Sequence, residues 1–382
     1  MIGTTQINVV QVCDRRWIRS LVALFLVAGL IGVDAPAYAE GTIIGTFCCD
    51  SWRNIALDAA GNVYTLNEED VQKTTPDGVS TIILDKRYGS EQDGGGGIGL
   101  DSAGNVYTVN VWSNNVSKIT PDGVSTILGT VGTTQAFGHM AVDVAGNVWV
   151  HTYEVDESVK PKKWTHFIVR ITADGVSTNL GEVPFVNDMA VDAAGNVYIP
   201  AMISKPKSPG DMDYVLKITP AGQRTKFSTG SRYSSSVVVD ADGNIYTANQ
   251  ATTNISKITP AGRLRIYGKT GPAPVDIAVD AAGNVYTANF LAQNVSKITP
   301  AGVSTILGET VGTPDEIVAS AAGDVYVLTG GFNDFDYFGN IFLFKRNAKK
   351  TTIICKKGNA LKNVTALKPV CPKGWNTGIF TK

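Results

Sequence analysis

The stretch VDIAVDAAGNVYTANFLAQNVSKITPAGVSTILG (Val275–Gly308) sets the pattern for most of the chain. Its core, Asp-x-x-Gly-(Asn/Asp)-x-(Tyr/Trp), starts at seven places: Asp58, Asp101, Asp143, Asp192, Asp240, Asp280 and, with Ser in place of Asp, Ser320. Successive starts are 43, 42, 49, 48, 40 and 40 residues apart. A period of this length with four short strands per unit is typical of a propeller blade. The sequence therefore predicts an all-β, seven-bladed β-propeller of four-stranded blades.

Each unit reads as four strands joined by tight turns. IAVD and VYTAN flank AAGN, where Gly283 supplies a left-handed backbone and Asp280 can accept turn N–H groups. VSKIT and VSTILG flank a second turn, Pro300–Gly302. The apolar positions Val279, Val285, Tyr286, Ile298 and Ile306, with their counterparts in the other units, are expected to be core.

This repeat resembles the NHL-repeat propellers and, more loosely, the secreted streptogramin-lyase-like propellers. The match runs from about Thr42 to Lys345. The resemblance implies the propeller fold, but such repeats serve binding proteins and enzymes alike.

The two ends of the repeat region complement each other. GTIIG (Gly41–Gly45) looks like a fourth strand with no first three before it, while the seventh unit has the first three strands. We expect the N-terminal strand to complete the last blade and close the ring. The alternative closing strand is Thr351–Cys355.

Residues 1–39 have the pattern of a signal peptide: three Arg, an apolar run from Leu21 to Val33, and Ala37-Tyr38-Ala39 as a cleavage site. A retained membrane anchor is the alternative. We expect export, to the medium, the periplasm or the cell surface, with the propeller spanning 40–346 and a basic two-Cys tail spanning 347–382. Export permits disulfides, and the favoured pairs are Cys355–Cys371 and Cys48–Cys49, with cross-links between the chain ends as the rival.

Charge is divided unevenly along a chain whose formal net charge is −1. Residues 345–382 hold ten Lys/Arg and no Asp/Glu, and residues 1–39 hold three Arg and two Asp, which leaves 20 basic and 32 acidic residues for the propeller. An acidic body argues against nucleic acid as a partner. The basic tail could attach to an anionic cell surface. We expect a monomer.

A row of mostly polar residues stands four places before each motif start. Strand alternation puts this row at the mouth of the central channel. Its polar members are the predicted ligand-binding residues: Asn54, His139, Asp188, Ser236, Asp276 and Glu316. Three converging carboxylates, Asp188, Asp276 and Glu316, suggest a Ca²⁺ or Mg²⁺ site. The alternative is that the row caps backbone N–H groups and holds channel water.

Three functions follow as hypotheses. The first is a binding module for a protein, glycan or small ligand at the channel mouth. The second is a metal-dependent lyase or lactonase-type hydrolase, with His139 as its base. The third is a structural scaffold at the cell surface. Variable loops that could contribute are His151–Phe167, with Trp164 and His166, then Ile203–Tyr214 and Phe332–Phe338, and also Trp52 and Arg53.

Overall fold

The computed structural model describes residues 41–48, 54–66, 70–85, 95–132, 134–203, 212–330, 338–346, 351–357, 360–366 and 376–377. These residues form strands and turns, and none of them is helical. The described chain accordingly has no helix that could cross a membrane. It divides into two compact units, residues 1–344 and 345–382.

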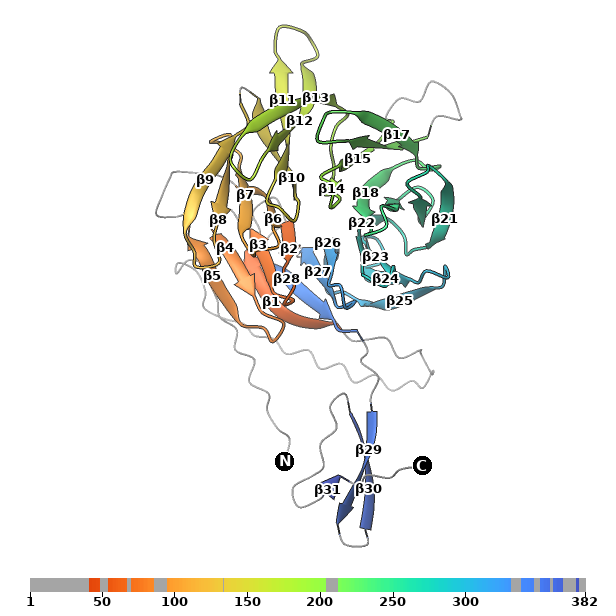
Figure 1. The fold of residues 1–382 in the computed structure, drawn as a ribbon. Helices are drawn as coiled ribbons and strands as arrows, with labels where there is room; N and C mark the ends of the chain where they lie inside the picture. Colours follow the sequence, from red (N-terminus) through yellow and green to blue (C-terminus); the bar gives the residue numbers. More distant parts are fainter. Residues whose placement is uncertain are drawn as a thin grey trace. The chain divides into compact units, whose positions relative to one another are not determined.

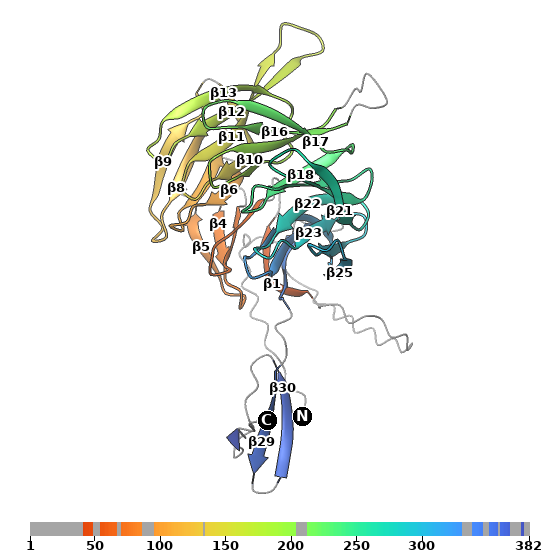
Figure 2. The same cartoon turned by 45° about the vertical axis from the view of Figure 1, so that its right-hand side comes forward.

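The first unit is the predicted seven-bladed propeller (Figures 1 and 2). Each blade is an antiparallel four-stranded sheet, and the first strands of neighbouring blades contact one another around the axis. Blade 1 consists of β2 (Asn54–Leu57), β3 (Val63–Leu66), β4 (Asp70–Thr74) and β5 (Ser80–Asp85). Blade 2 consists of β6 (Gly95–Leu100), β7 (Val106–Asn110), β8 (Asn115–Ile119) and β9 (Ser125–Thr130). Blade 3 consists of β10 (Gln135–Val142), β11 (Val148–Asp156), β12 (Lys163–Ile171) and β13 (Ser177–Val183). Blade 4 consists of β14 (Ala190–Val191), β15 (Val197–Ala201), β16 (Tyr214–Ile218) and β17 (Arg224–Ser228). Blade 5 consists of β18 (Ser234–Val239), β19 (Ile245–Asn249), β20 (Asn254–Ile258) and β21 (Leu264–Lys269). Blade 6 consists of β22 (Pro274–Val279), β23 (Val285–Asn289), β24 (Asn294–Ile298) and β25 (Ser304–Glu309).

Blade 7 confirms the predicted closure. It consists of β26 (Thr313–Ala319), β27 (Val325–Gly330) and β28 (Phe338–Phe344), completed by the N-terminal β1 (Thr42–Cys48). Strand β1 pairs with β28 from Thr42↔Leu343 to Cys48↔Phe338. The alternative closing segment lies in β29 (Thr351–Lys357), which pairs with β30 (Ala360–Ala366) and β31 (Asn376–Thr377) in the second unit. Pairing the two ends of the propeller in one sheet completes the seventh blade, and β1 becomes its outermost strand.

The repeated motif builds the hairpin turn between the first two strands of a blade. In blade 6, Asp280 Oδ1 accepts the backbone N–H groups of Ala282 and Asn284 at 3.0 and 2.8 Å. Its Oδ2 accepts the Tyr286 hydroxyl at 2.9 Å, and Gly283 has φ +75°. The aspartate therefore satisfies turn amides and anchors the buried tyrosine at once, as expected of a side chain that caps a tight turn.

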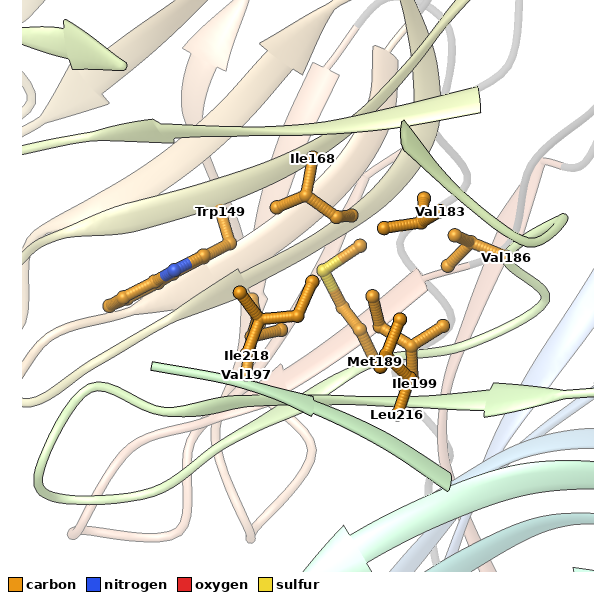
Figure 3. Packing of buried hydrophobic residues seen from close by; sticks show 10 residues of the cluster. Trp149, Ile168, Val183, Val186, Met189, Val197, Ile199, Leu216 and Ile218 are labelled. Atoms are coloured by element: carbon orange, nitrogen blue, oxygen red, sulfur yellow. The ribbon is translucent and has the colours of Figure 1, made fainter. Parts of the chain in front are cut away.

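The core of the propeller lies between blades. The described residues form seven buried apolar clusters, one at each contact between neighbouring blades, including that between blades 7 and 1. Figure 3 shows the cluster between blades 3 and 4, in which Trp149 and Ile168 face Val197 and Ile218. Each blade buries its faces on its neighbours, which is why the ring is stable only as a whole.

One core expectation was wrong in part. Val285, Tyr286 and Ile298 are buried, but the fourth-strand isoleucine is not uniformly so: Ile306 is half-buried, and its counterpart Ile127 is 59% exposed. The fourth strand is the outermost strand of the blade, so a side chain there can lack a neighbouring blade to pack against.

Candidate functional site

The polar row meets at one end of the central channel. All six predicted ligand-binding residues line a cavity of about 290 Å³: Asn54 on β2, His139 on β10, Asp188 just before β14, Ser236 on β18, Asp276 on β22 and Glu316 on β26. Blade 2, where the row has Gly97, contributes Ile98 instead. The sequence alignment of the blades therefore placed these side chains at a common site.

Sequence reasoning missed three polar residues that also line this cavity: Asn187, Ser235 and Asp315. Ser235 and Asp315 each precede a row member and lie where the register of the first strand shifts, between Ser234 and Ser236 and between Pro314 and Glu316. A β-bulge adds one residue and breaks strict alternation, so two consecutive residues can face the same space. A period-two pattern has no signal for such a bulge.

The carboxylates of the row join each blade to the next. Asp188 Oδ2 accepts the backbone N–H of Val237 at 2.8 Å, Asp276 Oδ2 that of Ile317 at 2.7 Å, and Glu316 Oε2 that of Ile55 at 2.9 Å. Asn54 Nδ2 continues the series by donating to the Gly96 carbonyl at 2.8 Å.

These contacts match the alternative in which the row caps backbone groups. An unpaired buried N–H costs about 1–3 kcal/mol, so this use of the carboxylates stabilises the ring.

Ser236 lies between two carboxyl groups of neighbouring blades. Its Oγ is 2.7 Å from Asp188 Oδ2 and 2.7 Å from Asp276 Oδ1. A hydroxyl has one proton, so both contacts are hydrogen bonds only when one carboxyl is protonated and donates to Ser236.

Of the two carboxyl groups, burial favours the protonated form at Asp276. Burial, reinforced by the charge of Asp188, raises the pKa of Asp276 to about 7.

The described carboxylates of the row do not form an assembled site for a divalent cation. Ca²⁺ and Mg²⁺ require about six or more oxygen ligands. Here one oxygen each of Asp188, Asp276 and Glu316 accepts a backbone N–H group, which uses part of its capacity to coordinate a metal ion. No group of three or more His, Cys, Asp or Glu within the described residues is arranged to hold a metal ion. The predicted metal ligands therefore converge on the cavity without forming an assembled metal site.

The three histidines of the chain form one cluster beside the cavity. His151 on β11 and His166 on β12 approach each other, with His151 Nε2 3.0 Å from His166 Nδ1. The ring of His139 stacks on His151 at 6.0 Å between centroids. Phe185 lies edge-on to both His151 and His166, at 6.1 and 5.2 Å. His139 is the member that lines the cavity.

Burial keeps this cluster neutral. It lowers the pKa of His139, opposed by the negative charge of Asp188, and it lowers the pKa of His166. The pKa of His151 falls to about 3, through burial and the two neighbouring imidazoles. At neutral pH His139 therefore presents an uncharged imidazole, which can accept or donate a hydrogen bond.

The three histidines lie within residues 139–166 of the sequence, but their spacing does not predict this cluster. The signal that could have revealed it is the length of the hairpin: His151 and His166 lie on one face of two strands that pair from Val148↔Ile171 to Asp156↔Lys163. Several other predictions fall outside the residues that the structure describes, or outside those whose side chains it describes. They concern the signal peptide, Trp52 and Arg53, most of Ile203–Tyr214 and Phe332–Phe338, and the cysteines Cys48, Cys49, Cys355 and Cys371.

Comparison with solved structures identifies similar propellers. Virginiamycin B lyase from Staphylococcus aureus, in a catalytically inactive variant with quinupristin, aligns with a TM-score of 0.58 at 14% identity, covering 79% of this chain and 98% of that chain. A streptogramin B lyase structure aligns with a TM-score of 0.57 at 13% identity, covering 81% and 95%. At such identities the likeness shows a shared fold. The chain matches no protein-family model and no curated protein, so the NHL-repeat resemblance stays a prediction.

Proposed function

We propose that this protein is a binding protein whose axial cavity holds a small polar ligand. The observation that supports this most is the convergence of His139, Asp188, Ser236 and Asp276 from four blades on one cavity of about 290 Å³. Small-molecule sites are typically concave, with a few polar groups that fix the ligand's orientation. The volume suits a ligand of about the size of a monosaccharide or an amino acid.

The lining of the cavity favours neutral or cationic ligands over anions. Four of the described lining residues carry carboxyl groups, Asp188, Asp276, Asp315 and Glu316, and none is Lys or Arg. An anion would meet like charge without a compensating cation. The neutral imidazole of His139 adds a donor or an acceptor without adding charge.

A thermal-shift screen tests this proposal. The probes are small neutral polyols, amino sugars and amino acids, with dicarboxylic acids as the anionic set. We expect a neutral or cationic class to raise the melting temperature, and His139→Phe to abolish the effect. His166→Phe is the matched control, since His166 does not line the cavity. Stabilisation only by dicarboxylic acids, or equal loss in both variants, would contradict the proposal.

A second candidate is a lyase or lactonase-type hydrolase that uses the same cavity. It is favoured by the buried His139, whose lowered pKa leaves an unprotonated base facing the cavity at neutral pH. The streptogramin B lyases that share the fold make this class worth testing. Here His139 would remove a proton from the substrate or from water, with no metal in the step.

Mass spectrometry of quinupristin and simple lactones after incubation distinguishes these reactions. Ring opening by elimination leaves the mass unchanged, whereas hydrolysis adds one water. Turnover that is lost in His139→Ala and kept in His166→Ala would support catalysis. Turnover that survives His139→Ala would exclude the proposed base, and a complete lack of turnover would leave the binding proposal as the better account.

We also infer that the protein is exported and that its tail attaches it to the cell surface. The partner at the ring would be a protein, a glycan or a small molecule. The tail belongs to its own compact unit, residues 345–382, so a chain ending at Arg346 is a practical variant. Cell fractionation with N-terminal sequencing should find a mature protein beginning at Glu40. Loss of surface retention in the shortened chain would support attachment by the tail and favour a scaffold role, whereas unchanged retention would refute it.

A further inference from the structure

We propose a second binding site, for a neutral oligosaccharide, on the extended hairpin of blade 3. This site is separate from the axial cavity and does not depend on the function proposed for it. Strands β11 and β12 are nine residues long, whereas the equivalent strands of blade 6, β23 and β24, have five. The additional length carries the hairpin beyond the ring, as the two views show (Figures 1 and 2).

The hairpin carries a hollow of its own. A cavity of about 620 Å³ is lined by Gln135, Tyr153, Glu154, Val155, Glu157, Lys162 and Trp164. Strand pairing sets Gln135 beside Tyr153 and Val155 beside Trp164. None of these residues lines the axial cavity. The hollow is therefore built by the insertion of blade 3 and by the first residue of the neighbouring strand.

Two aromatic rings form its apolar surface. Tyr153 and Trp164 lie 5.1 Å apart with an interplanar angle of 37°, and Trp164 is 52% exposed. An exposed tryptophan loses little conformational entropy on binding and offers a large apolar face. The apolar C–H face of a pyranose ring is complementary to such a surface.

The polar groups around these rings match hydroxyl groups. Glu154 and Glu157 are acceptors, Lys162 is a donor, and the amide of Gln135 can do both. Glu157 Oε1 and Lys162 Nζ lie 2.6 Å apart in an exposed pair. An exposed pair of this kind contributes little to stability, so a ligand can compete for it at low cost.

The same groups argue against a simple cation as the ligand. Aromatic sites for cations rely on rings that present their faces to the charge. Here the two rings lie at a modest angle rather than around a point, and Lys162 lines the same hollow as Trp164. A neutral ligand with many hydroxyl groups uses every class of side chain present.

Isothermal titration calorimetry tests the site, with maltotetraose, cellotetraose and chitotetraose as probes. We expect at least one to bind, and Trp164→Ala to weaken that binding about tenfold or more, which corresponds to loss of about 1.4 kcal/mol. Trp112→Ala is the matched control, because Trp112 is 74% exposed in the turn between β7 and β8 of blade 2. Trp164→Phe should retain part of the affinity.

The outcomes separate this site from the axial one. Binding that is unchanged in His139→Phe but lost in Trp164→Ala supports an independent saccharide site. The proposed saccharide site would be overturned if none of the tetrasaccharides bound at about 10 mM, because a dissociation constant above this concentration is too weak for specific recognition. Equal loss in Trp112→Ala, or binding of benzyltrimethylammonium at Trp164 in the absence of saccharide binding, would also overturn it.

Discussion

Blade 6 and blade 3 use the same repeat in different ways. In blade 6 the Tyr286 hydroxyl donates to Asp280 Oδ2 at 2.9 Å, and Lys297 lies over the Tyr286 ring at 5.5 Å. Blade 3 has Trp149 in place of the tyrosine, and Arg170 lies over it at 5.6 Å. The buried indole N–H of Trp149 has no hydrogen-bond partner among the described residues.

The contrast indicates where this chain departs from pure scaffold. Blade 6 satisfies the polar groups of its motif turn, as a structural unit should. Blade 3 loses one of these hydrogen bonds and also carries the histidine cluster and the hollow at Trp164. Departures from the hydrogen bonding of the repeat are expected near functional sites, because residues with a purely structural role keep the arrangement that the fold favours.

Replacing the motif aspartate should have the largest effect on the free energy of unfolding. The loss should be larger in blade 6 than in blade 3. Asp280→Ala leaves two turn amides, the Asn284 side chain and the Tyr286 hydroxyl without their acceptor. We expect a loss of about 2–4 kcal/mol in the free energy of unfolding. Asp143→Ala should cost about 1 kcal/mol less, because Trp149 makes no such bond. Denaturant unfolding measures both, and equal losses would contradict the comparison.

The proton shared in the polar row should make stability depend on pH. The folded-state pKa of Asp276 is raised from 3.8 to about 7. The contribution of protonated Asp276 to the stability of the fold is therefore complete below about pH 4 and is lost as pH rises through about 7. Asp276→Asn imitates the protonated form. We expect the melting temperature of this variant to improve relative to the native protein as the pH rises from about 5 to 8.

Ser236→Ala is the control for this titration, since it removes the hydroxyl between the two carboxyls but leaves Asp276 able to titrate. A constant difference between Asp276→Asn and the native protein across the same pH range would show that Asp276 does not hold the proton.

The stability that the histidine cluster of blade 3 contributes should fall on acidification, which is opposite to the pH dependence of Asp276. Its effect on stability near neutral pH should be smaller. The pKa of His151 is lowered from 6.5 to about 3, so its neutral form supports the fold above about pH 6.5, and this support is lost as pH falls through about 3. His151→Phe should therefore lose less stability than the native protein between about pH 7 and pH 4.

Tyr153→Phe, on the same strand β11, is the control because it leaves all three imidazoles in place. Parallel melting curves for native protein and His151→Phe on acidification would contradict the prediction for blade 3.

Metal removal should have the smallest effect. The carboxylates of the polar row bind backbone N–H groups, so the ring does not need a cation to hold them together. We expect EDTA to leave the melting temperature unchanged, and metal analysis to find no stoichiometric Ca²⁺ or Mg²⁺. A drop in melting temperature on chelation that Ca²⁺ or Mg²⁺ reverses would restore the metal-site hypothesis.

Much of the fold and part of the site could be predicted because they depend on local pattern. The spacing of the motif from Asp58 to Ser320 gave the number of blades, and GTIIG at residues 41–45 gave the closing strand. Alignment of the blades gave the six polar cavity residues, because equivalent strands of a ring end at the same place. Asn187, Ser235 and Asp315 were missed. For Ser235 and Asp315 the reason is that the bulges beside them break the alternation on which the alignment relies.

The sequence by itself determined the repeat, its turns and the end of the channel where polar residues gather, since hairpins and alternation act over a few residues. Only the tertiary structure decided what those residues do. The hydroxyl of Ser236 meets Asp188 and Asp276 because three blades bring residues 48 and 40 positions away to one point. The environment of His151 was likewise fixed by packing, because burial in a closed ring changes the pKa of a group more than its sequence neighbours do.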